Sequence, residues 1–194
     1  MVLEAFPEGT WHTGVSRFYR LARSHLARLE RLVLDVNAKW PKALDESVKD
    51  HEITPELDAM VLERDTTSDT CRIFAAMAVE AFLNFYGAAR LGEEEFNSHF
   101  ERLAVVPKTR QLLLICDRLS IAEGDPLIKA LKAVAESRNK LVHPKAKKAS
   151  PGDDPEKYWS PIPGAAREAV AAMETFFSEF QALVPDSLHF LPMA

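Results

Sequence analysis

The stretch TCRIFAAMAVEAFLNFYGAARL, residues 70 to 91, decides the fold. Apolar residues occupy nearly every side of a helix drawn through it, whereas a surface helix keeps one polar face. The stretch therefore predicts a central helix that other helices cover. Ser68 and Asp69 are good N-cap residues, so we expect this helix to begin there. We expect Gly87 or Gly92 to loosen or end it.

Amphipathic helices are predicted on both sides of this stretch. Apolar residues at spacings of three and four predict a helix over residues 15–40, which Pro41 ends. Residues 41–68 are weakly periodic and predict a loop with a short helix at 55–63. Further helices are predicted over residues 93–103, 107–119, 125–142 and 165–184. We find no strand signal and no internal repeat, and we therefore predict an all-α bundle of five to six helices in a single domain, residues 1–194.

Composition limits the function classes. The chain of 194 residues carries 24 Lys and Arg against 29 Asp and Glu, so its formal net charge is −5. A chain that coats nucleic acid would be basic overall, so any anion site must be a local patch. The first fifteen residues do not predict a signal peptide, and the longest apolar run, residues 73–79, is far shorter than the roughly 20 residues of a membrane span. We expect a cytoplasmic protein without a membrane partner.

Metal and cofactor sites are not indicated. The six histidines do not occur three to five apart on one helix, and there is no glycine-rich phosphate loop. Cys71 and Cys116 lie in apolar helical patterns, which favours core residues over a disulfide or a metal site. We therefore expect no metal and no cofactor.

Two polar residues of the central helix need a reason. Glu80 and Asn84 are four positions apart and share a face. Burying them unpaired would cost a few kcal/mol. One interpretation is a helix–helix hydrogen bond or a partly wet groove, and the other is that they line a site.

The stretch ESRNKLVHPKAKK, residues 136 to 148, is the second informative segment. Arg138 and His143 lie about 140° apart on an ideal helix, so they share a face only if the helix ends between them. Pro144 disfavours helical geometry at His143, so the imidazole can turn toward the guanidinium. Nearby lysines favour an anion here, namely Lys140, Lys145, Lys147 and Lys148. The alternative is an ordinary helix end with basic residues at its negative pole.

The environment of Arg138 can also be predicted. The inner face of its helix is expected to run through Leu127, Leu131, Val134, Ala135, Arg138 and Leu141 or Val142. The same spacing of Arg and His occurs in RLARSH, residues 20–25, where no helix end follows. We interpret that copy as a chance match.

RNKLVHPK at the end of an amphipathic helix resembles the motif of HEPN domains, an Arg, usually a polar residue, and a His after four to six intervening residues. AVEAFLNFYG resembles the first core helix of bacterial HEPN-like proteins. The similarity covers residues 68–148, and residues 1–67 and 149–194 would be flanking helices and loops. The resemblance implies an up-and-down, HEPN-like bundle that forms a homodimer.

The resemblance also implies a function. Many HEPN proteins are metal-independent endoribonucleases, including toxins and defence effectors, in which the ribose 2′-hydroxyl attacks the phosphate. Arg138 and His143 would be the catalytic pair, Asn139 would support them, and RNA contacts are expected from Lys140, Lys145, Glu80 and Asn84. RNA and an antitoxin or regulatory protein are the expected partners. Two alternatives stay open: a non-catalytic HEPN-like module for dimerisation or for binding RNA or protein, and a bundle that binds a small ligand at Glu80 and Asn84.

Overall fold

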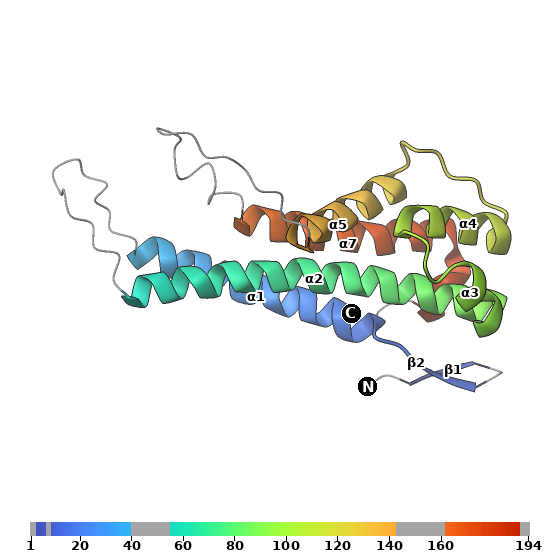
Figure 1. Ribbon diagram of the computed structural model, residues 1–194, viewed down its shortest axis with the longest axis horizontal. Helices are drawn as coiled ribbons and strands as arrows, with labels where there is room; N and C mark the ends of the chain where they lie inside the picture. The colour runs from blue at the N-terminus through green and yellow to red at the C-terminus, as the bar shows by residue number, and fades with distance from the viewer. Residues whose placement is uncertain (1–2, 7–8, 40–54, 143–161, 191–194) are drawn as a thin grey trace.

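The computed structural model describes residues 3–6, 9–39, 55–142 and 162–190. These residues form six α-helices, a two-stranded hairpin and a final 3₁₀ helix, so the predicted all-α bundle is confirmed. Figure 1 shows four long helices running side by side in alternating directions: α1 (Val15–Lys39), α2 (Pro55–Leu91), α5 (Pro126–Val142) and α7 (Ile162–Leu183). Two shorter helices, α3 (Glu93–His99) and α4 (Val105–Asp117), lie at the C-terminal end of α2.

Helix α2 is the central element, and it is longer than the sequence predicts. Its 37 residues span about 55 Å. Pro55 suits a first helical position, and Glu56 and Asp58 place negative charge in the first turn. The predicted start at Ser68 and Asp69 is therefore wrong. The predicted stop is right, because Gly92 follows Leu91 with a φ of 90°.

The side chains of Ser68 and Asp69 explain the wrong start. An N-cap side chain accepts a hydrogen bond from the backbone of its own helix. Here the Ser68 hydroxyl donates instead to the carbonyl oxygen of Ile162 in α7, at 2.7 Å. Asp69 accepts from the guanidinium of Arg72. Both side chains therefore make contacts within the bundle instead of capping a helix, and α2 continues past residues 68 and 69.

The core lies where α1, α5 and α7 pack against α2. Helix α1 buries Val15, Ala22, Leu29 and Val36, a spacing of seven residues typical of long helices packed side by side. Phe82 of α2 meets Phe180 of α7 with ring centroids 4.8 Å apart, edge to face. Cys71 is also fully buried, and Cys116 is half-buried; both are free thiols, as the sequence predicts.

Helix α5 begins as the sequence predicts. Asp125 Oδ1 accepts a hydrogen bond from the backbone N–H of Leu127 at 2.9 Å, which is an N-cap bond, and Pro126 occupies the first helical position. Pro185 follows the end of α7 and opens the 3₁₀ helix η1 (Pro185–Phe190). The capping signals at these two positions were therefore sufficient.

The hairpin is a correction to the sequence analysis, which found no strand signal. Strands β1 (Leu3–Phe6) and β2 (Gly9–His12) pair antiparallel, with Leu3 opposite His12 and Phe6 opposite Gly9. Each strand has only four residues, too few for the alternation of apolar and polar residues to be read with assurance. The hairpin precedes α1 and leaves the helical architecture unchanged (Figure 1).

Candidate functional site

The last turn of α5 carries three of the residues that the sequence selects. Arg138, Asn139 and Lys140 are exposed there, and α5 ends at Val142. His143 and Lys145 lie outside the described residues. What the structure provides is a solvent-facing guanidinium, amide and ammonium on consecutive residues at the negative end of a helix.

The position of Arg138 differs from the prediction in one respect. The sequence places Arg138 on the inner face of α5, with Leu127, Leu131 and Val134. Those three leucine and valine side chains are buried, but Arg138 is exposed. Val142 is also exposed, so the last turn of α5 extends past the covered part of the bundle. A guanidinium in that turn is in contact with water, where an anion can reach it.

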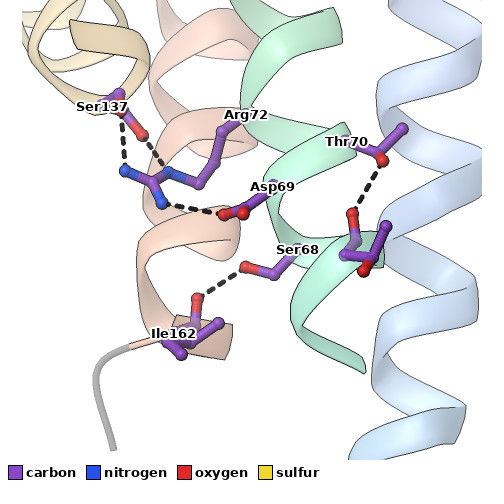
Figure 2. A network of polar contacts seen from close by, with 7 residues as sticks. Ser68, Asp69, Thr70, Arg72, Ser137 and Ile162 are labelled. Atoms are coloured by element: carbon purple, nitrogen blue, oxygen red, sulfur yellow. Dashed lines mark hydrogen bonds and ion pairs between the residues drawn. The ribbon is translucent and has the colours of Figure 1, made fainter. Parts of the chain in front are cut away.

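A buried arginine holds the turn that precedes Arg138. Figure 2 shows Arg72 reaching from α2 to Ser137 of α5. Its Nε donates to Ser137 Oγ at 2.9 Å and its Nη2 donates to the Ser137 carbonyl oxygen at 2.7 Å. Its Nη1 donates to Asp69 Oδ1 at 3.2 Å. Only 8% of Arg72 is exposed, so these bonds form largely out of water, where they are strongest.

Asp69 completes this group. Burial raises the pKa of Asp69 above its ordinary value, and the charge and hydrogen bond of Arg72 oppose that rise. The carboxylate is still partly solvated, since 47% of its side chain is exposed. Arg72 therefore has one anionic partner on its own helix and two neutral acceptors on α5. The arrangement fixes Ser137, the residue immediately before Arg138, to the central helix.

Glu80 and Asn84 have different environments. Asn84 is half-buried, and its Oδ1 accepts a hydrogen bond from Lys108 Nζ of α4 at 2.7 Å. This is the helix–helix hydrogen bond that one of the two interpretations predicted. Glu80 is exposed, so it does not bear the cost of an unpaired buried carboxylate. Burial lowers the pKa of Lys108, and the negative charges of Glu80 and Glu101 oppose that shift.

The structure does not bring Glu80 and Asn84 to the end of α5. Eight residues separate Arg72 from Glu80, which is about 12 Å along the helix, and Asn84 is about 18 Å from Arg72. Arg72 contacts α5, whereas Asn84 contacts α4. The residues selected from the sequence thus form two groups on α2, and only the group near Arg72 adjoins Arg138.

Three residues were not predicted from the sequence: Arg72, Ser137 and Lys108. Arg72 carried a signal, since it is a lone cation inside an apolar run and needs a partner when buried. No local pattern could identify that partner, because Ser137 is 65 positions away. Lys108 carried no signal, since a lysine after Pro107 in a first turn is ordinary on a surface helix. Its complete burial is a consequence of how α4 packs on α2.

The second Arg-to-His pair, Arg20 and His25 of RLARSH, places its two side chains in different environments. In α1, Arg20 is exposed, whereas the ring of His25 is half-buried against Phe74 with centroids 5.7 Å apart. This arrangement fits the interpretation of RLARSH as a chance match, because the two side chains serve different surroundings. The exposed Arg20 also supplies a matched control for substitution of Arg138.

Within the described ranges, no three His, Cys, Asp or Glu side chains gather in a way that could hold a metal ion. Over the same ranges, no helix is both long enough and apolar enough to cross a membrane. No family model, curated protein or solved structure matches the chain.

Proposed function

We propose that this chain is a HEPN-like endoribonuclease whose site lies at the end of α5. One observation supports the proposal: the exposed Arg138 and Asn139 lie near the C-terminal end of the described part of α5, and a buried arginine fixes the preceding residue, Ser137, to the central helix. Catalysis by positioned side chains requires such support from the scaffold. The alternating four-helix core is the architecture that the resemblance implies.

The chemistry follows from the residue types. His143 would take the proton of the attacking ribose 2′-hydroxyl or give a proton to the leaving oxygen, because imidazole titrates near neutrality. Arg138 would bind the phosphate and stabilise the charge that develops in the transition state. Asn139 would support this pair, and Lys140 and Lys145 would attract the RNA backbone.

Support for a homodimer comes from the exposed face of α2. Ile73 and Met77 lie one turn apart on this face and are 40% and 37% exposed. Glu80 continues the same face one turn further on. Exposed apolar side chains one turn apart on the central helix suit an interface. A second copy bound there would bring two Arg138 side chains onto one assembly.

The experiment is cleavage of end-labelled single-stranded RNA by purified protein in excess chelator. Wild type is expected to cleave RNA and to leave the same sequence intact when it carries 2′-O-methyl groups, which removes the nucleophile. His143→Ala and Arg138→Ala are each expected to lower the rate by at least about 100-fold. His99→Ala and Arg20→Ala are the matched controls, since both side chains are exposed and lie elsewhere.

Two results would contradict the proposal. Cleavage that survives His143→Ala, or that also occurs with 2′-O-methyl RNA, would contradict the proposed mechanism.

A monomer measured by light scattering at micromolar concentration would contradict the proposed homodimer. Ile73→Lys is expected to lower the molecular mass of the particle, whereas Leu114→Lys, an equally apolar exposed position on α4, is expected to leave it unchanged.

The second candidate function is a non-catalytic module of the same fold. The observation that favours it is the apolar face at Ile73 and Met77, which serves protein binding without any catalytic group. In that case wild type forms the dimer but does not cleave RNA, and Arg138→Ala changes neither mass nor stability. The two functions therefore predict different results in the cleavage assay and the same result in the mass measurement.

A further inference from the structure

Helix α5 is positively charged along its solvent-facing side. Within residues 126–142, four Lys and Arg residues stand against a single acid, Glu136, so this helix carries a formal charge of +3 in a chain of −5. Helices α2, α3 and α7 each contain more acids than Lys and Arg residues. A chain that is acidic overall can bind a polyanion only through such a local patch.

Three lysines lie on one side of α5. Lys129, Lys132 and Lys140 fall within about 80° around the helix axis, and Asn139 borders the same sector. Lys129 and Lys140 are exposed, and 43% of the Lys132 side chain is exposed. Lys129 and Lys140 are about 16 Å apart along the axis. The three ammonium groups therefore form a line along the helix, and the line ends beside Arg138.

A fourth cation extends this line onto α4. Arg110 of α4 and Lys132 of α5 both form ion pairs with Glu123, which lies in the loop before α5. Two cations share one carboxylate, so the group keeps one positive charge. The Arg110 and Glu123 side chains are 36% and 61% exposed. Water weakens ion pairs of this kind, so an incoming phosphate can take the place of the carboxylate.

Helix α1 is the other strongly positive helix, but it lies on the opposite side of α2 from α5 (Figure 1). Phe74 of α2 packs against α1, whereas Arg72 contacts α5, and these two positions point about 160° apart. Two arginines of α1, Arg23 and Arg28, already form ion pairs. The positive surface that continues from Arg138 is therefore that of α5.

We propose that the lysine-bearing side of α5 binds the phosphate backbone of single-stranded RNA. The inference rests on the proposed function for the identity of the polyanion. Lys129 and Lys132 contact phosphates beyond the one that reacts, and Arg110 adds charge from α4. Glu136 lies in the same sector and opposes binding. Ammonium groups bind phosphate as point charges, so this surface supplies affinity and orientation without reading the bases.

The test is binding of a 2′-O-methyl RNA of about twelve nucleotides to the full chain, measured by fluorescence anisotropy at several salt concentrations. This RNA lacks the free 2′-hydroxyl, so binding can be measured whether or not the chain cleaves RNA. Lys129→Gln and Lys132→Gln are each expected to weaken binding about two- to fivefold. Each should also lower the slope of log affinity against log salt by about 0.7. Glu136→Gln is expected to tighten binding.

Lys39→Gln is the matched control, because Lys39 is exposed at the end of α1. Unchanged affinity in this variant supports the inference. An equal loss in Lys39→Gln, or wild-type affinity in both Lys129→Gln and Lys132→Gln, would overturn it. Equally tight binding of a glutamate peptide of the same charge would also overturn it, because the surface would then accept any polyanion.

Cleavage kinetics separate this inference from the proposed function. If the chain cleaves RNA, Lys129→Gln is expected to raise KM and to leave kcat nearly unchanged, because Lys129 is remote from the reacting phosphate. The effect should vanish on a dinucleotide, which is too short to reach Lys129, and an equal effect there would contradict the inference. If wild type does not cleave RNA, the proposed function fails, whereas the binding measurement still decides whether α5 holds the RNA backbone.

Discussion

Arg72 and Ser137 tie the central helix to the last turns of α5. The guanidinium donates to both the hydroxyl and the carbonyl oxygen of Ser137, at 2.9 and 2.7 Å, while Asp69 accepts its third bond (Figure 2). One planar group thus satisfies three acceptors on two helices, which a lysine could not reproduce. Because Arg138 follows Ser137 directly, the geometry of the candidate site depends on a residue that never has to touch a substrate.

We expect Arg72→Gln to destabilise the fold by about 1–3 kcal/mol, since it leaves Ser137 and the half-buried Asp69 without a charged donor. Urea unfolding measures the loss. Hydrogen exchange is expected to accelerate most at residues 137–142, because the end of α5 loses its attachment. Ribonuclease activity, where present, is expected to fall with it through kcat.

Arg167→Gln is the control for Arg72→Gln. Arg167 forms a bidentate pair with Glu30 at 2.6 and 2.7 Å, but both side chains are nearly half exposed. Water screens such a pair, so we expect a loss of less than about 1 kcal/mol. Equal losses in the two variants would show that the burial of Arg72 adds nothing.

The second prediction concerns Tyr86, Asp117 and Arg90, which join α2 to α4. The Tyr86 hydroxyl donates to Asp117 Oδ2, and Arg90 Nη2 donates to Asp117 Oδ1 at 2.6 Å. Only 8% of the Asp117 side chain is exposed. Tyr86→Phe keeps the packing against Phe82 and Phe180 but removes this donor to a charged acceptor. We expect a loss of about 1.5–3 kcal/mol.

A double-mutant cycle isolates this bond. We expect Asp117→Asn to destabilise the protein as well, and the double variant to lose less than the sum of the two single losses. For a chain of this size, each kcal/mol lowers Tm by roughly 2–4 °C, so calorimetry resolves the effect. Additive losses would mean that the hydroxyl and the carboxylate do not stabilise each other.

Features that depend on residues nearby in the sequence were predicted, whereas features that depend on distant residues were not. The start of α5 and the ends of α2 and α7 depend on signals within a few residues, such as Asp125-Pro126 and Gly92, and these were predicted. The start of α2 failed for the opposite reason. Ser68 can cap a helix, but its hydroxyl finds an acceptor in Ile162, 94 positions away.

The candidate site shows the same limit. Arg138, Asn139 and Lys140 could be selected from their positions before a helix end, and the structure leaves all three in solvent. The support from Arg72 and the buried Lys108 beneath Asn84 could not be selected, because each depends on a partner in a different helix. Local sequence therefore indicated which side chains are displayed, and tertiary packing determined which of them are held.

The third prediction is a loss of stability in alkali. Burial raises the pKa of Cys71 to about 12, from an ordinary value of 9.0, and it also raises the pKa of Cys116 and Tyr86. Above pH 9 the unfolded thiol loses its proton while the native thiol keeps it. The unfolded state then binds fewer protons, so the free energy of unfolding falls as pH rises toward 12.

Unfolding measured between pH 8 and 10.5 tests this prediction. Each fully raised group contributes a slope of about 1.4 kcal/mol per pH unit within its window. We expect Cys71→Ala to be less stable at pH 8, because it leaves a small cavity, and to show a shallower decline above pH 9. A decline as steep as that of wild type would mean that Cys71 does not titrate on unfolding.

The last prediction compares two glycines in helices. A Cβ built on Gly87 of α2 would collide with the ring of Phe96 and would lie 3.1 Å from Leu112 Cδ2, so α3 and α4 pack directly on this backbone. A Cβ on Gly164, in the first turn of α7, would meet nothing within 4 Å. Alanine favours a helix over glycine by up to about 1 kcal/mol at either position.

We therefore expect opposite signs. Gly164→Ala should stabilise the protein by a few tenths to about 1 kcal/mol, because only the unfolded chain is affected. Gly87→Ala should destabilise it by about 1–3 kcal/mol, because the aromatic ring must move against a packed core. Thermal unfolding of both variants measures the difference. Since Phe96 belongs to α3, Gly87→Ala should in addition shift the amide signals of residues 93–101, whereas Gly164→Ala should leave them in place.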